Sequence, residues 1–301
     1  WSDPTAPAPL CHTLMSSGKW VIQYPPGTGF LLSLFPEGSQ VIGLFAVANL
    51  MIFFISAFAI ALAPSLRVIF LSASVASATQ YFMINPVKAS YSAAPTMVLC
   101  AAVGYLTGML LFSRKSQRSR MYILLGIGLL LGIGVNIRIA NILLSAGYLV
   151  ALSFCFFYKQ TVASILEGVT FSGALVVGLM PTLAANAINA GAPFSTTYGA
   201  QDTLPVDLTF GIAGAYFFSI QGCLILLALL GAIYLLFAKF GQSRLLISLL
   251  VTSNVVLNSA YFFSHPVFTP YYMMPIAMLS IWTLLFYITA QSKDRVIWAA
   301  I

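Results

Sequence analysis

The chain has 301 residues, of which 60% are hydrophobic and 6% are charged, and its formal net charge is +7. A soluble domain carries roughly 25% charged residues, so this composition excludes a soluble globular fold and indicates that lipid is the main solvent. Unpaired backbone groups are costly in hydrocarbon, which leaves α-helices or closed β-barrels. The apolar runs are continuous and about 18–25 residues long, which favours helices over alternating barrel strands.

The chain begins at Trp1 with a polar, proline-rich stretch that carries no basic signal region. Within it, the pattern from Pro9 to Gly18 predicts a short surface helix, with proline in the first turn and glycine after the last. We expect residues 1–40 to form an extracytoplasmic loop and residues 41–301 to form the transmembrane domain. Because the loop has no export signal of its own, we also expect an apolar helix before Trp1 in the native gene, so that this chain is N-terminally truncated.

About nine apolar segments follow, each close to the length that a spanning helix needs. They are Val41–Ala63, Val68–Ile84, Ala94–Phe112, Met121–Val135, Ile139–Phe157, Gly168–Ala185, Gly211–Phe237, Leu245–Phe263 and Tyr271–Ala290. The second and fourth are short and hold polar residues, which leaves open whether they cross fully. The sequence therefore predicts an all-α, polytopic transmembrane bundle.

Small and amide side chains inside these segments predict helix contacts. Glycines at positions 104 and 108, and again at 128 and 132, permit two helices to approach closely. Five amide side chains lie in apolar surroundings, and we expect them to make hydrogen bonds between helices; they are Gln80, Asn141, Gln221, Asn254 and Asn258. Cys100, Cys155 and Cys223 also lie in apolar segments and suit packing.

The basic residues divide unequally between alternate connections. If all nine segments cross, one side holds Arg67, Arg114, Lys115, Arg118, Arg120, Lys159, Lys239, Arg244, Lys293 and Arg295, and the other holds Lys19, Lys88 and Arg138. The positive-inside rule places the richer side in the cytoplasm. Residues 1–40, residues 186–210 and the loop at His265 then lie outside, and the net charge reflects orientation rather than a nucleic-acid partner.

The most distinctive polar stretch is Tyr24-Pro25-Pro26-Gly27-Thr28-Gly29. Two prolines fix the backbone directly before glycines that free it. Such a turn can hold a loop against a cleft at the membrane surface, or it can be a stiff turn that leads into a helix. The residues alone leave both interpretations open.

Four stretches, in chain order, resemble one family of membrane enzymes. They are Asp3–Gly27 (an acid, small residues, Gly-Lys-Trp and Tyr-Pro-Pro-Gly), Asn85–Thr96, Gly132–Arg138 and Ala192–Gly199. They are similar to two external loops, a glycine-rich helix ending in a basic residue, and a further loop of GT-C fold glycosyltransferases. This class includes the protein-mannosyltransferase and aminoarabinose-transferase relatives. These enzymes use polyprenyl-phosphate-linked sugars, so the resemblance implies a bacterial member in the inner (plasma) membrane.

The resemblance also implies roles for charged residues. Asp3 matches the general base that acts on the acceptor, although Asp before Pro4 also suits a turn cap. Arg138 matches the cation that binds the phosphate of the lipid donor, and Lys88, also on the outer side, is a second candidate for that contact. Both basic residues also suit a role in orienting the chain in the membrane.

Other residues on the outer side are candidates for positioning the substrate. They are the turn residues Tyr24, Pro25, Pro26 and Gly27, together with Tyr198, Asp202 and His265. A lone histidine or a solvated loop acid equally suits a structural role. No spacing of residues in the sequence predicts a metal site. A divalent metal cofactor therefore stays an open alternative that no motif supports.

Ala93 and Ala94 depart from the family, because many members carry a second acid in that neighbourhood. This departure argues against a two-acid mechanism and keeps a non-catalytic membrane scaffold open. A transporter or flippase of an amphipathic substrate would need charges or broken helices at mid-membrane. Apart from Glu167, which lies near the start of an apolar segment, acids are missing there. We therefore expect a glycosyltransferase that takes a polyprenyl-phosphate sugar and a lipid or glycan acceptor.

Overall fold

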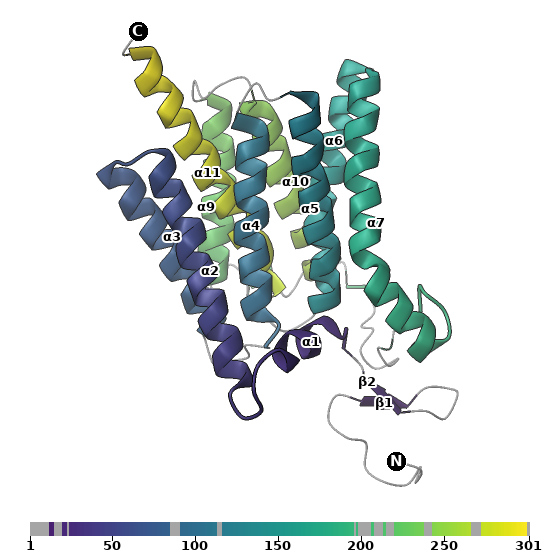
Figure 1. The fold of residues 1–301 in the computed structure, drawn as a ribbon. Coiled ribbons are helices and arrows are strands. Elements are labelled where there is room, and N and C mark those ends of the chain that lie inside the picture. Colours follow the sequence, from purple (N-terminus) through teal and green to yellow (C-terminus); the bar gives the residue numbers. More distant parts are fainter. Residues whose placement is uncertain are drawn as a thin grey trace.

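The computed structural model describes residues 12–14, 20–22, 24–84, 91–112, 116–195, 197, 206–207, 213–214, 220–237, 243–265 and 272–299. Most of these residues are helical, and the long helices stand side by side in one bundle (Figure 1).

The helices cross the bundle up and down in chain order, except for the short first helix, which lies across its lower end (Figure 1). They are α1 (Gly27–Ser33), α2 (Gln40–Leu62), α3 (Leu66–Ile84), α4 (Ala93–Phe112), α5 (Gln117–Ile137), η1 (Ile139–Ser145), α6 (Ala146–Lys159), α7 (Val162–Ala190), α9 (Ile220–Phe237), α10 (Arg244–Ser264) and α11 (Met274–Ala299). Among the described residues, eight stretches are long and apolar enough to span a membrane, the 3₁₀ helix η1 and α6 together forming one, and α9 adds a shorter apolar helix. The chain is therefore a multi-pass, all-α integral membrane protein, as the sequence predicted.

The first loop differs from its sequence prediction. Two three-residue strands, β1 (His12–Leu14) and β2 (Trp20–Ile22), pair antiparallel. The surface helix predicted over Pro9–Gly18 is therefore wrong, since β1 occupies its middle. Strand pairing satisfies the backbone through a partner further along the chain, and a helical pattern this short cannot exclude it. The short helix of this loop is α1, which begins directly after two prolines and lies across the lower end of the bundle in Figure 1.

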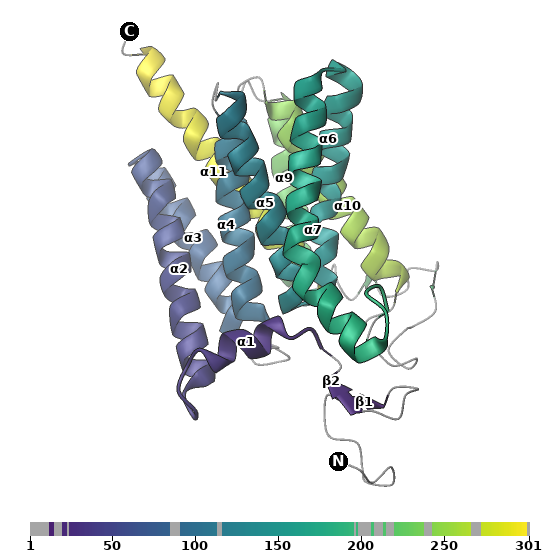
Figure 2. The ribbon, with the colours of Figure 1, turned by 45° about the vertical axis from the view of Figure 1, so that its right-hand side comes forward.

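Close helix contacts build the centre of the bundle. A Cβ on Gly132 of α5 would collide with the backbone of α7 at Leu175, and one on Gly104 of α4 would collide with Trp282 of α11. The predicted close packing at these glycines is confirmed. In α11, 89% of the spanning window is buried, against 28% in α2, α3 and α7, so α11 is central and the other three face lipid. Figure 2 shows α2 and α3 at one edge of the bundle, away from α7.

The connections gather at two ends, which the views of Figures 1 and 2 separate clearly. We call the lower one the Arg138 end; it carries α1, the β1–β2 pair, Arg138 and the end of α10. We call the upper one the basic end; the basic residues there include Arg67, Arg118, Arg120, Lys159 and Arg244. This division follows the alternation that the sequence predicted.

Candidate anion-binding site at the Arg138 end

Arg138 lies at a break in the helical path. The helix α5 ends at Ile137, Arg138 is extended with φ −158° and ψ 123°, and η1 begins at Ile139. Only 9% of Arg138 is exposed. An arginine inside a transmembrane bundle is costly, and such residues usually face a functional site. This position is therefore the strongest candidate for a functional charge at this end.

The guanidinium of Arg138 lies against an aromatic ring. Its Cζ atom is 4.1 Å from the centre of the Tyr272 ring, and Tyr272 lies two residues before α11. The Tyr272 ring packs in turn on Phe262 of α10, with 5.4 Å between ring centres. A cation–π contact contributes about 0.5–2 kcal/mol.

Buried amides hold the backbone at the helix break. Asn141 donates through Nδ2 to the carbonyl of Gly134, at 2.9 Å, and to Oγ1 of Thr96 on α4, at 3.1 Å. Asn258 of α10 donates through Nδ2 to the Leu143 carbonyl in η1, at 3.0 Å. Non-helical backbone at membrane depth needs partners of this kind. These hydrogen bonds give the break, and with it Arg138, a defined position.

Asn254 completes this support one turn earlier on α10. Its Oδ1 accepts from the Gly147 backbone at 2.8 Å, and its Nδ2 donates to the Leu144 carbonyl at 3.2 Å. Of the five amides for which the sequence predicted hydrogen bonds between helices, the prediction is confirmed for Asn141, Asn254 and Asn258.

The Pro-Pro-Gly turn packs on the end of α5 that precedes Arg138. Thr28 donates through Oγ1 to the Ile137 carbonyl at 3.0 Å. A Cβ on Gly27 would collide with the Asn136 carbonyl, so glycine is what allows α1 to approach so closely. The stretch is thus the start of a helix and also a loop held against the end of the bundle.

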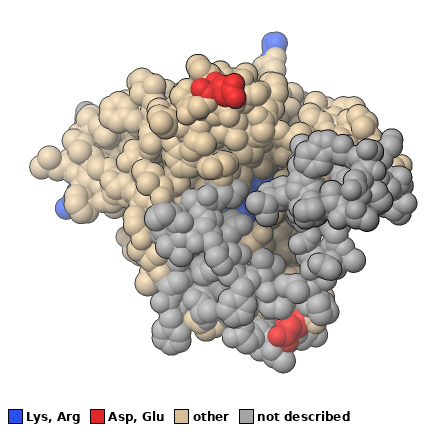
Figure 3. Space-filling model, turned by 90° about the horizontal axis from the view of Figure 1, so that it is seen from below, with Lys and Arg blue, Asp and Glu red and all other residues tan. Residues whose placement is uncertain are grey.

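His265 follows α10 at the same end. Its ring stacks on Tyr261, with 4.4 Å between ring centres. The backbone N–H of Asp207 donates to the Ser264 carbonyl at 2.7 Å, which places the segment of Asp207 beside the His265 turn. Seen from this end, basic atoms lie on the floor of a recess near the middle of the face (Figure 3).

The structure brings together Arg138, the Tyr24–Gly27 turn and His265 at one end of the bundle. The predicted site residues Asp3, Lys88, Tyr198 and Asp202 lie outside the described residues, and their roles stay predictions. Sequence reasoning missed Tyr272, because the arginine it covers is far away in the chain and no local pattern connects the two.

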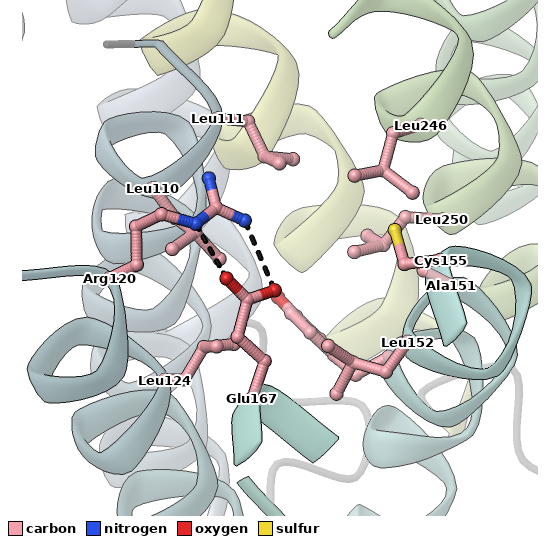
Figure 4. A pocket seen from close by; sticks show the side chains of 11 residues that line it. Leu110, Leu111, Arg120, Leu124, Ala151, Leu152, Cys155, Glu167, Leu246 and Leu250 are labelled. Atoms are coloured by element: carbon pink, nitrogen blue, oxygen red, sulfur yellow. Dashed lines mark hydrogen bonds and ion pairs between the residues drawn. The ribbon is translucent and has the colours of Figure 1, made fainter. Parts of the chain in front are cut away.

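The other charged cluster lies nearer the basic end. A cavity of about 30 Å³ is lined by apolar side chains and by Arg120 and Glu167 (Figure 4). Arg120 donates through Nε to Oε1 of Glu167 at 2.7 Å and through Nη2 to Oε2 at 3.3 Å. Glu167 is 7% exposed. A bidentate pair of opposite charges ties α5 to α7, so its chemistry is that of a structural contact.

Within the described part of the chain, no group of three His, Cys, Asp or Glu side chains is placed to hold a metal ion. Comparisons with family models, curated proteins and solved structures give no match for this chain. The fold and the site define a multi-pass helical membrane protein with a buried arginine at a helix break.

Proposed function

We propose that this protein is a glycosyltransferase of the bacterial inner membrane. It takes a sugar from a polyprenyl-phosphate-linked donor and transfers it to a lipid or glycan acceptor at the extracytoplasmic face. The observation that carries the proposal is Arg138, a buried cation at a supported helix break beside the Pro-Pro-Gly turn.

The chemistry of arginine suits the donor. A guanidinium offers five N–H donors in a plane and binds phosphate through paired, charge-assisted hydrogen bonds. In the donor, that phosphate lies where the polyprenyl chain meets water. Arg138 lies at the end of α5, which is the corresponding depth in a bundle of spanning helices.

The position of the break favours a transferase over a transporter. Transporters place broken helices and substrate sites near the middle of the bilayer. Here the break between α5 and η1 adjoins the end of the bundle that carries α1. The unequal division of basic residues supports the orientation, since the richer end faces the cytoplasm.

The test is sugar transfer by the full-length protein with polyprenyl-phosphate donors. Arg138→Ala should raise the donor KM about 10–100-fold, because hydrogen bonds to a charged group contribute about 1.5–3 kcal/mol. The donor KM of Arg138→Lys should lie between those of the wild type and Arg138→Ala, since lysine keeps the charge and loses the paired geometry. Arg67→Ala, an exposed arginine at the basic end, is the matched control and should leave the donor KM unchanged.

One result would overturn this function: a correctly folded wild-type protein that transfers no sugar from any polyprenyl-phosphate donor, which would favour the scaffold. An active Arg138→Ala variant whose donor KM equals that of the wild type would instead overturn the role of Arg138 in binding the donor.

A further inference from the structure

His265 has one ring nitrogen committed to the protein. Its Nδ1 lies 2.9 Å from the Tyr261 carbonyl and 3.1 Å from Oγ of Ser264. A carbonyl oxygen only accepts, so the hydrogen of the neutral ring is on Nδ1. The lone pair is then on Nε2, and no hydrogen bond joins Nε2 to another described residue.

This histidine is connected to Arg138 by a series of ring contacts, which begins with a stacked pair and continues through an edge-to-face pair and a tilted pair. From the His265 ring, the next is Tyr261 at 4.4 Å, then Phe262 at 5.2 Å. Phe262 packs on Tyr272, with 5.4 Å between ring centres, and the Arg138 Cζ atom lies 4.1 Å from the centre of the Tyr272 ring. The orientation of His265 and that of Arg138 are therefore set by one packed cluster at the end of α10 and the start of α11.

A histidine with a fixed tautomer is the usual form of a general base. One nitrogen is oriented by a carbonyl or carboxylate, and the other accepts a proton from the substrate. The cluster provides both halves of this arrangement, at the end of the bundle where the donor phosphate binds.

We propose that Nε2 of His265 is the general base that activates the acceptor hydroxyl; this rests on the proposed function. The acceptor proton moves to Nε2 as the acceptor oxygen forms its bond to the anomeric carbon of the sugar. The bond from that carbon to the phosphate oxygen breaks, and the polyprenyl phosphate leaves with the electron pair. The imidazolium then releases its proton to water. The resemblance gives this step to Asp3, so the two assignments compete directly.

The experiment compares His265→Asn, Asp3→Asn and the wild type in the same transfer assay. The asparagine amide can still donate to the Tyr261 carbonyl, but it offers no base at the Nε2 position. His265→Asn should lower kcat about 10²–10⁴-fold, the usual contribution of a positioned base, with the donor KM nearly unchanged. His12→Asn, at the other histidine of the chain, is the matched control and should keep wild-type turnover.

The pH profile separates catalysis from a structural role. In the wild type, kcat/KM should fall on the acid side, as it does in a reaction that needs a free general base, and this fall should be absent in His265→Asn. Added imidazole should restore part of the activity of the variant. If the variant does not fold, the wild-type profile still decides, since a rate without an acid limb contradicts a histidine base.

The outcomes distinguish the two proposals. An active wild type with a folded His265→Asn variant close to wild-type turnover overturns the assignment of the base and leaves the transferase intact. If Asp3→Asn then shows a large loss of kcat, the proton transfer is assigned to Asp3. A wild type without transferase activity overturns the function and the base together.

Discussion

The two ends of the bundle use buried polar groups in different ways. At the basic end, Arg120 and Glu167 satisfy each other and tie α5 to α7. At the Arg138 end, the amides of Asn141 and Asn258 hold the backbone at the helix break. The ring of Tyr272 packs against the guanidinium of Arg138. A buried charge therefore indicates a functional site only when its surroundings are taken into account. A charge in a bidentate pair strengthens a helix contact, whereas a charge at a supported break has a place to meet a ligand.

The sharpest test of this contrast is which end faces the cytoplasm. Single cysteines would be placed at Ser116, exposed at the basic end, and at Phe194, 88% exposed at the Arg138 end, after the native cysteines are replaced. In intact cells an impermeant maleimide should label position 194 and not position 116, an all-or-none difference. The reverse pattern would refute the predicted orientation.

The ion pair at the basic end should matter for stability rather than for donor binding. Glu167→Gln removes the carboxylate from Arg120, and breaking a buried pair costs about 3–5 kcal/mol. We expect less, about 2 kcal/mol, since the Arg120 side chain is 24% exposed and can extend toward water. Thermal unfolding in detergent measures the change.

The control for this pair is a double variant, Arg120→Leu with Glu167→Leu. It leaves no uncompensated charge and should unfold closer to the wild type, because apolar replacement of a buried pair is often neutral. A double variant as unstable as Glu167→Gln would contradict the interpretation, and so would a raised donor KM in either variant.

The amides at the Arg138 end should give the smallest change in stability. Asn258→Leu loses the hydrogen bond to the Leu143 carbonyl, and such bonds between membrane helices contribute about 0.6–1.7 kcal/mol. The same variant should raise the donor KM, because η1 begins directly after Arg138. Val256→Ala, an exposed neighbour on α10, should leave the donor KM as it is. If Asn258→Leu kept the wild-type donor KM, the hydrogen bond from Asn258 would not be needed to position Arg138 for donor binding.

Parts of the site were predictable from local patterns. Arg138 was a candidate because it interrupts an apolar region, and the Pro-Pro-Gly turn because its residues constrain the backbone within a few positions. The predicted helix over Pro9–Gly18 failed because β1 finds its partner in β2, outside that window. The role of Tyr272 could not be predicted from the sequence, since nothing near it in the chain indicates its contact with Arg138.

The sequence by itself determined that this is a multi-pass helical membrane protein, and it predicted which connections share a side. It can do so because lipid forces each spanning segment to satisfy its own backbone, so that continuous apolar runs and their flanking charges carry the information locally. Only the tertiary structure decided which side chains meet. The stack of Tyr272 on Arg138, the pair of Arg120 with Glu167 and the support of η1 by Asn258 each join distant parts of the chain, and their partners are set by helix packing, which no local pattern encodes.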